Sequence, residues 1–239
     1  MDKTAIVRRI DRVARDTLLV DLAMHEPAEL DFQSGQFITI DAGTDRGGSR
    51  AYSVASRAAR KDGFELIVKL VGGGLASRRF SGLHPGDELA FSGPRGFFTL
   101  LRRHPGDVVF AVTGVGIAAA LPLVGDLLAR TDERGRVLFF WGVREQRDLF
   151  FTDRLAELEG ASDRFELHVC LTKPDAGWRG VHGRILDPIL AALPSLEQPT
   201  FYAVGNGSMT QALTKALVER GIDRRRQIRT EQFYPVDEP

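Results

Sequence analysis

The stretch Arg50-Ala51-Tyr52-Ser53, which continues as Val54-Ala55-Ser56, is the segment around which the first half of the chain is organised. In an extended strand, side chains alternate between the two faces. Arg50 and Tyr52 would then share one face, about 6.5–7 Å apart. At that spacing a guanidinium and an aromatic ring could hold the phosphate tail and the flat ring of one ligand. Taken alone, an exposed strand whose Arg and Tyr cover apolar surface is the simpler interpretation.

Further strand-like segments surround this stretch in the first hundred residues. Together with the Arg50 segment they make six short strands separated by turn residues, which is typical of a small antiparallel barrel. We therefore expect an N-terminal antiparallel β-barrel domain over residues 1–100. The other strands are predicted at 4–14, 17–24, 36–40, 64–71 and 88–91, and a short helix at 76–80.

The character of the sequence changes at residues 101–106, which we interpret as a linker. Beyond it, continuous apolar strands alternate with helices, as in a parallel sheet covered on both faces. This pattern predicts a C-terminal α/β domain over residues 107–239. Strands are expected at 108–112, 137–141, 165–171, 200–204 and 227–230, and helices at 116–130, 148–158, 184–193 (interrupted by Pro188) and 208–220.

The bulk composition excludes several classes of protein. A chain of 239 residues is long enough for two domains, and equal numbers of Lys+Arg and Asp+Glu (32 each) argue against nucleic-acid binding. The run Arg224-Arg225-Arg226 is interpreted as a solvated turn. Cys170 is the single cysteine, so neither an internal disulfide nor a cysteine-ligated iron–sulfur cluster can form within the chain. Without an apolar signal region or an apolar run of about 20 residues, we expect a cytoplasmic protein with no membrane segment.

Thr113-Gly114-Val115-Gly116 joins the first strand of the α/β half to its helix. Glycines let backbone approach a ligand, and a helix N-terminus offers free N–H groups to a pyrophosphate. The motif departs from the usual dinucleotide fingerprint, since Ala119 stands where a third glycine would be. The loop Val204-Gly205, which leads to Met209, follows a later strand and is expected to line the same crevice.

A second glycine-rich loop, Gly72-Gly73-Gly74, ends a strand of the barrel and leads to Ser77. It is a second candidate for anion binding, with a flexible hairpin as the alternative. The histidines at 25, 84, 104, 168 and 182 are scattered without metal-ligand spacing, and no Ser/His/Asp set is evident. We expect no metal site, so the chemistry would have to come from bound cofactors.

Taken together, the motifs resemble the ferredoxin–NADP reductase superfamily, in the order in which that family carries them. The resemblance spans almost the whole chain and lies closest to the flavin and oxygenase reductase branch that lacks an iron–sulfur module. The matching motifs are Arg50-x-Tyr52-Ser53, Gly74-x-x-Ser77, Gly93-Pro94-x-Gly96-x-Phe98 and Thr113-Gly114-x-Gly116-Ile117.

The resemblance implies a role for each matching residue. In the barrel, Arg50 would contact flavin phosphates, Tyr52 would pack on the flavin ring and Ser53 would bond near its N5. In the α/β domain, Glu231 and Phe233 would join Ser53 as catalytic residues, with Phe233 near the ring face where nicotinamide stacks. The remaining cofactor-binding residues implied are Val68, Lys69, Leu70, Gly74 and Ser77 for the flavin, and Thr113, Gly114, Gly116, Arg144, Gly205 and Met209 for the nicotinamide nucleotide.

Two features leave the details of the cofactors open. Val204 stands where the family often has Cys, which suggests that hydride transfer is tuned differently. Lys173 follows a strand where a cation could meet the 2′-phosphate of NADPH, or could simply be exposed, so NADH and NADPH both remain possible. The resemblance favours FAD over FMN, because most of the family uses FAD.

The function expected is that of an NAD(P)H-dependent flavoprotein reductase. It would take hydride onto flavin N5 and pass electrons to a separate carrier, such as a ferredoxin, a flavodoxin or an oxygenase component. The segment around Trp178 supports an alternative, a free-flavin reductase in which flavin is a substrate. Val204 supports another, a non-catalytic nucleotide-binding electron-transfer subunit.

Overall fold

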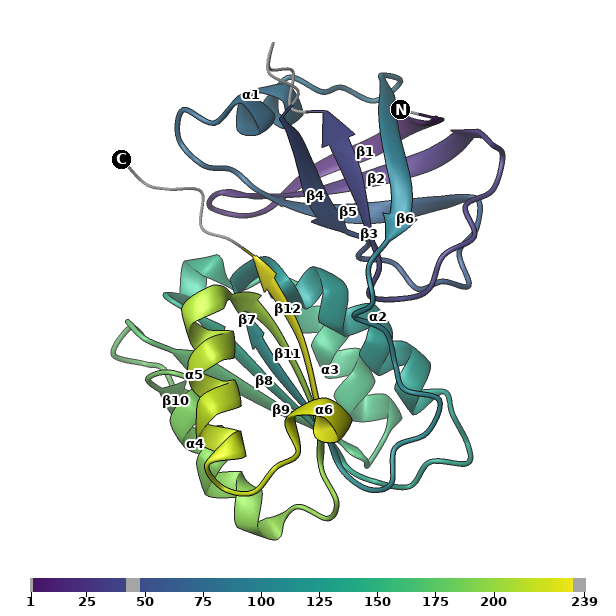
Figure 1. Ribbon diagram of the computed structural model, residues 1–239. Helices are drawn as coiled ribbons and strands as arrows, with labels where there is room; N and C mark the ends of the chain where they lie inside the picture. Colours follow the sequence, from purple (N-terminus) through teal and green to yellow (C-terminus); the bar gives the residue numbers. More distant parts are fainter. Residues whose placement is uncertain (1, 42–47, 234–239) are drawn as a thin grey trace.

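A computed structural model of the chain describes residues 2–41 and 48–233 and has two domains, one above the other in Figure 1. The strands are β1 (Lys3–Ala14), β2 (Thr17–Glu26), β3 (Phe37–Asp41), β4 (Ser49–Ser53), β5 (Gly63–Lys69), β6 (Glu88–Arg95), β7 (Val108–Thr113), β8 (Val137–Val143), β9 (Phe165–Leu171), β10 (Val181–His182), β11 (Thr200–Asn206) and β12 (Ile228–Phe233). The α-helices are α1 (Leu75–Ser81), α2 (Ile117–Leu128), α3 (Thr152–Ala161), α4 (Leu186–Ala192), α5 (Gly207–Val218) and α6 (Arg224–Gln227), and the 3-10 turns are η1 (Gly114–Gly116), η2 (Gln146–Asp148) and η3 (Leu193–Ser195).

The N-terminal domain is an antiparallel six-stranded sheet in the order β4-β3-β6-β1-β2-β5. Its two outer strands meet where Val54 pairs with Leu66, which closes the sheet into a barrel. Apolar side chains that alternate along the strands fill the interior, among them Val20, Phe64 and Phe91, each fully buried. The predicted barrel is confirmed.

The C-terminal domain is a parallel six-stranded sheet in the order β10-β9-β8-β7-β11-β12. Helices α2 and α3 cover one face, and α4 and α5 cover the other (Figure 1). Strands covered on both faces need apolar side chains on both, which explains continuous runs such as 108–112. The predicted α/β architecture is confirmed.

Three local predictions are wrong. The helix expected at 148–158 is instead η2 and then α3, because the chain turns at Phe151, whose φ is +58°. Pro188 does not interrupt α4, since it lies in the first turn, where a missing N–H costs no hydrogen bond. The run Arg224-Arg225-Arg226 forms the short helix α6, because the Asp223 carboxylate accepts the N–H groups of Arg225 and Arg226.

One apolar cluster crosses the boundary between the domains. Leu19 and Ile67 of the barrel and Phe98, which follows β6, are buried together with side chains of α2 such as Ile117 and Leu121. The turn η1 also lies against β5. The glycine motif that opens the second domain is therefore placed beside the barrel.

Candidate functional site

Strand β4 carries Arg50, Tyr52 and Ser53 at the edge of the barrel sheet. The Tyr52 ring is half-buried and meets Phe80 of α1 edge to face, with ring centroids 5.0 Å apart. Burial raises the pKa of Tyr52 to about 12, although the charges of Arg50 and Arg79 oppose the rise, so the phenol stays neutral. Arg50 is exposed, and its guanidinium donates to the Ser49 carbonyl at 3.2 Å.

The end of β5 leads into the glycine loop beside β4. Val68 is buried, and the exposed Lys69 ammonium lies 3.6 Å from an Asp16 carboxylate oxygen. The Leu70 N–H donates to the Asp16 carbonyl at 2.7 Å, which ends the strand two residues earlier than predicted. The Ser77 hydroxyl accepts the Val71 N–H at 2.8 Å, which fixes the start of α1.

Open backbone follows in this loop. Gly74 precedes α1, and no described atom lies within 4 Å of a Cβ built on Gly72 or Gly73. Gly73 has a φ of +75°, a conformation that L side chains rarely adopt. The exposed Arg78 guanidinium donates to the Gly73 carbonyl at 2.7 Å. The loop thus offers accessible backbone with a cation beside it, which suits a phosphate group.

Ser53 connects the barrel to the last strand of the second domain. Its buried hydroxyl donates to Oε1 of Glu231 on β12 at 3.2 Å, across 178 residues of sequence. Burial raises the pKa of Glu231 to about 7, and the bond from Ser53 offsets part of the rise. Phe233 ends the same strand and is half-buried against the core beneath α2 and α3. The structure therefore brings together the three residues expected to be catalytic in the same region.

The turn after β7 and the turn after β11 pack against each other, as expected. A Cβ on Gly205, whose φ is +126°, would lie 2.3 Å from the Thr113 hydroxyl oxygen, and that hydroxyl accepts the Asn206 N–H at 2.9 Å. A Cβ on Gly116 would lie 2.8 Å from the Val204 carbonyl oxygen. Gly114, with a φ of +52°, has no described atom within 4 Å of its built Cβ. Close packing on one side leaves open backbone on the other.

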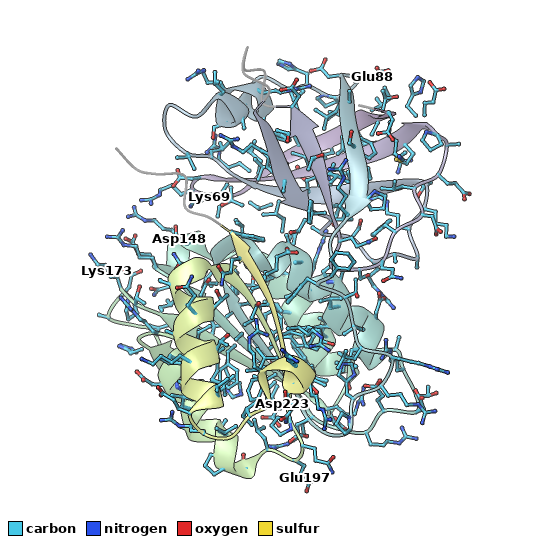
Figure 2. The ribbon with its side chains drawn as sticks, viewed as in Figure 1. Lys69, Glu88, Asp148, Lys173, Glu197 and Asp223 are labelled. Carbon is cyan, nitrogen blue, oxygen red and sulfur yellow. The ribbon has the colours of Figure 1, made fainter. Side chains whose placement is uncertain are left out.

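Arg144 and Lys173 lie side by side after β8 and β9. The Lys173 N–H donates to the Arg144 carbonyl at 2.8 Å, and both side chains are exposed. Arg144 Nε lies 3.7 Å from Oε1 of Glu145, and the other oxygen of this carboxylate pairs with Arg147. In the view of Figure 2, Lys173 lies on the same side of the molecule as Lys69 of the barrel. This corner therefore combines several cations with a carboxylate.

Two residues singled out by sequence are engaged elsewhere in packing. Met209, in the first turn of α5, is half-buried against the core between the sheet and α4 and α5. Trp178 packs against the opposite core, and its indole N–H donates to the Val181 carbonyl at 3.2 Å. Both side chains have a structural function in the fold.

The residues present fit a flavin dinucleotide and a nicotinamide dinucleotide. Each domain has a glycine of positive φ in one of these loops, Gly73 in the barrel and Gly114 in the α/β domain, where a built Cβ meets no described atom within 4 Å. Arg50 and Arg78 supply positive charge on the barrel, and Tyr52 supplies a neutral aromatic ring. Such a donor set suits phosphate groups joined to flat rings.

Several polar contacts in the structure have no signal in the sequence. Arg154 of α3 pairs with Glu65 of β5, and Asp126 of α2 pairs with Arg57, so both pairs join the two domains. His104, in the predicted linker, is also buried, with Nδ1 2.7 Å from Glu133 and Nε2 2.9 Å from the Tyr202 hydroxyl. From sequence alone, charged residues of this kind are predicted to lie at the surface, because their partners are not known.

Among residues 2–41 and 48–233, no helix is long and apolar enough to cross a membrane. In the part of the chain that the structure describes, no three His, Cys, Asp or Glu side chains gather to hold a metal ion.

Comparison with known proteins agrees with the two-domain geometry. Residues 4–100 match the family model of an oxidoreductase FAD-binding domain, and residues 110–215 match that of an oxidoreductase NAD-binding domain. The chain is 33% identical over 241 residues to the reductase subunit of an aromatic O-demethylase from Amycolatopsis sp., covering 98% of the chain and 70% of that protein. It is 31% identical over 222 residues to the reductase component of propane 2-monooxygenase from Rhodococcus jostii, covering 90% of the chain and 59% of that protein.

Solved structures give the same result. The Amycolatopsis cytochrome P450 reductase GcoB superposes with a TM-score of 0.88 at 31% identity, over 98% of this chain and 70% of that one. A ferredoxin NADP+ reductase from Neisseria gonorrhoeae with bound FAD and NADP superposes with a TM-score of 0.80 at 25% identity, over 96% and 97% of the two chains.

The fold and the family matches define an oxidoreductase with two domains, an FAD-binding barrel and an NAD-binding α/β domain. The chain belongs to the ferredoxin–NADP reductase superfamily, as its sequence motifs indicated.

Proposed function

We propose that this oxidoreductase takes reducing equivalents from NADH or NADPH and passes them to a separate electron-carrier protein, such as a ferredoxin, a flavodoxin or an oxygenase component. The observation that carries the proposal is the contact between Ser53 and Glu231, which joins β4 of the FAD-binding domain to β12 of the other domain at 3.2 Å. The names of two relatives, the reductase component of a monooxygenase and the reductase subunit of an aromatic O-demethylase, support the choice of acceptor.

In this proposal the barrel residues hold FAD. The Arg50 cation would pair with its phosphates, the Gly74–Ser77 segment would bind the same group through backbone N–H groups, and Tyr52, a neutral phenol, would pack against the flavin ring. The backbone of Val68, Lys69 and Leu70 would lie beside the ring. FAD, when bound, supplies the hydride acceptor and the means to release electrons singly.

Residues of the α/β domain bind and orient the coenzyme. Thr113, Gly114 and Gly116 would offer backbone to its pyrophosphate, with Gly205 packed against Thr113, and Phe233 would lie near the ring face where nicotinamide stacks. The exposed Arg144 would contact the adenosine part of the nicotinamide nucleotide. Met209, in the first turn of α5, supports the loop that contains Gly205. Orientation of this kind can lower a barrier by about 7–11 kcal/mol.

We also propose the bounds of the domains and the location of the protein. Residues 1–100 form the FAD domain, residues 101–106 the linker and residues 107–239 the NAD(P) domain, and the protein is cytoplasmic.

Glu231 can bind and release a proton at the domain boundary, and Ser53 orients its carboxylate. With a pKa of about 7, the Glu231 carboxyl can hold or release a proton near neutral pH. The Ser53 hydroxyl donates to that carboxylate and keeps it directed at the barrel edge. With this pKa, the Glu231 carboxyl would supply or accept a proton at the edge of β4 beside Ser53.

The test is an anaerobic titration of the purified protein with NADH and, separately, NADPH. We expect a yellow protein that bleaches with one or both coenzymes and then reduces ferricyanide. A colourless protein, or a yellow one that does not bleach, would contradict the proposal. Flavin that separates on gel filtration while turnover persists would instead identify a free-flavin reductase, and nucleotide binding without dye reduction a non-catalytic subunit.

A further inference from the structure

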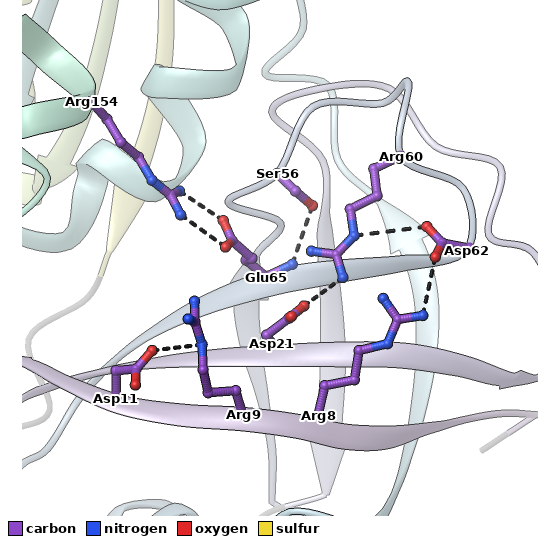
Figure 3. A network of polar contacts seen from close by, with 9 residues as sticks. All are labelled: Arg8, Arg9, Asp11, Asp21, Ser56, Arg60, Asp62, Glu65 and Arg154. Carbon is purple, nitrogen blue, oxygen red and sulfur yellow. Dashed lines mark hydrogen bonds and ion pairs between the residues drawn. The ribbon is translucent and has the colours of Figure 1, made fainter. Parts of the chain in front are cut away.

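Two ion pairs of opposite polarity span the boundary between the domains. Glu65 of β5 binds the Arg154 guanidinium of α3 through two hydrogen bonds of 2.7 and 2.9 Å (Figure 3). Arg57, which follows β4, donates from Nε to Oδ1 of Asp126 on α2 at 2.7 Å. The barrel thus presents one anion and one cation, and the α/β domain presents their complements.

Both pairs are built into the interface. Glu65 is only 8% exposed, and its two oxygens receive the planar fork of Arg154. The second oxygen of Asp126 accepts the Ser34 hydroxyl at 2.6 Å, so this carboxylate holds two groups of the barrel. The Glu65 main-chain N–H donates to the buried Ser56 hydroxyl at 3.2 Å, which fixes the strand that carries the anion.

The opposite polarity of the pairs favours one orientation of the domains. If the partners were exchanged, Glu65 would face Asp126 and Arg57 would face Arg154. Like charges brought together in this way are strongly unfavourable, whereas apolar packing alone is tolerant of small rotations. The ion pairs therefore add the directional information that the shared apolar cluster lacks.

A continuous series of contacts leads from Arg154 to the coenzyme turn. Its guanidinium carbon lies 4.2 Å from the centroid of the Phe151 ring, and Phe151 meets Phe150 edge to face at 5.3 Å. Phe150 in turn meets Trp141 edge to face at 5.3 Å. The Trp141 indole N–H donates to the Gly114 carbonyl at 3.0 Å. The ion pair between Arg154 of α3 and Glu65 of the barrel is therefore connected to the Gly114 turn by direct side-chain contacts.

We propose that Arg154 and Asp126 are positioning residues, which orient the α/β domain on the barrel so that the Gly114 turn faces the β4 edge at Tyr52 and Ser53. This inference rests on the proposed function, in which the coenzyme lies at that turn. Neither residue touches the reacting atoms. Each acts through the relative placement of the two domains, where an error of about 1 Å can cost about 100-fold in rate.

The test measures the distance between the domains directly. Spin labels are placed on Arg9→Cys in β1 and Gln211→Cys in α5, both exposed sites, while the native Cys170 is fully buried and burial raises its pKa to about 11, so we expect it to take no label. In this background, Glu65→Gln and Arg154→Met are expected to broaden the distance distribution. At saturating coenzyme they should slow flavin bleaching by about 10- to 100-fold, while the coenzyme Kd changes by less than about threefold.

A matched control lies within the barrel. Arg60 pairs with Asp21 at 2.6 Å, and Asp21 is the cross-strand neighbour of Glu65, but this pair does not cross the interface (Figure 3). Arg60→Met should leave the distance distribution and the bleaching rate unchanged. Arg154→Lys keeps the charge but loses the fork and should give an intermediate distribution. The exchange Glu65→Arg with Arg154→Glu should restore a narrow one.

Two results would overturn the inference. One is an unchanged distribution and bleaching rate in folded Glu65→Gln and Arg154→Lys proteins. The other is equal broadening by Arg60→Met, which would assign the effect to general destabilisation. Failure of the wild-type protein to bleach would contradict the proposed function instead, and the distance measurement would still decide whether the ion pairs orient the domains.

Discussion

Glu231 is the side chain whose ionisation depends most clearly on the fold. Burial raises its pKa from 4.5 to about 7. Since the folded-state pKa lies above the unfolded-state value, the folded protein holds an extra proton within this window, and the free energy of unfolding falls as pH rises through it. Glu231→Gln should abolish this pH-dependent fall in the free energy of unfolding, which is on the order of 3 kcal/mol. Urea unfolding of both proteins at pH 5 and pH 8 measures the difference.

Ser53→Ala provides the companion variant for that measurement. The Ser53 hydroxyl favours the ionised form of Glu231, so its loss should raise the pKa of the carboxyl further and move the pH-dependent step upward. Parallel stability profiles for wild type and Glu231→Gln would show that Glu231 ionises as it does in water.

A substitution of Arg50 tests the proposed FAD-binding site. Its side chain is exposed and bonds only to the neighbouring Ser49 carbonyl among the described contacts, so Arg50→Ala should change the free energy of unfolding little. Loss of a charge-assisted bond to phosphate should raise the Kd for FAD about 10- to 100-fold. The control is Arg12→Ala, an exposed arginine on β1 that bonds to the Arg15 carbonyl. An equal Kd for FAD in the two variants would mean that Arg50 is not part of the FAD-binding site.

At the scale of elements, the turn after β11 depends on Gly205. Its φ of +126° and the 2.3 Å approach of its built Cβ to Thr113 Oγ1 leave no room for a side chain. Gly205→Ala should lower the free energy of unfolding by at least about 2 kcal/mol and displace the Gly114 turn. The control is Gly160→Ala in α3, where the built Cβ meets no described atom and helix propensity gains up to about 1 kcal/mol. Thermal unfolding of both variants checks the contrast.

Sequence patterns predict the elements where local and global preferences agree. Strand β7 and helix α2 are strongly apolar and are separated by the glycines of the Gly114–Gly116 turn, so the sequence pattern locates both. The reversal at Phe151 is different, because its left-handed backbone is imposed by packing against Phe150 and Arg154. The two-residue strand β10 exists only through its pairing with β9, which no local pattern encodes.

For the candidate site, the sequence indicates the motifs but not which of them come into contact in the folded protein. Glycine turns and the β4 residues could be located because each motif is contiguous. The bond from Ser53 to Glu231 joins residues 178 apart, and that from Arg154 to Glu65 joins residues 89 apart. An Arg or Glu in an otherwise ordinary pattern favours the surface, so only the packed domains reveal which charges become partners.

At the scale of the whole molecule, the shared apolar cluster predicts cooperative unfolding. Domains in one chain move and unfold separately unless their interface is large and apolar. Here Ile67 of the barrel is 4% exposed in the cluster that also contains Ile117 and Leu121 of α2. Calorimetry should therefore show one transition. Ile67→Ala should lower its midpoint at a cost of about 2–4 kcal/mol without splitting it.

The interior of the barrel supplies the contrast for this prediction. Ile40 is 1% exposed in the barrel core alone and has no part in the shared cluster. If the domains unfold together, Ile40→Ala also lowers the single midpoint, because loss of the barrel exposes the α2 face that Ile67 covers. If they unfold independently, Ile40→Ala produces an early barrel transition and leaves a later one at the wild-type temperature. The second pattern would mean that the interface orients the domains without coupling their stability, so that the ion pairs rather than the apolar cluster govern their relationship.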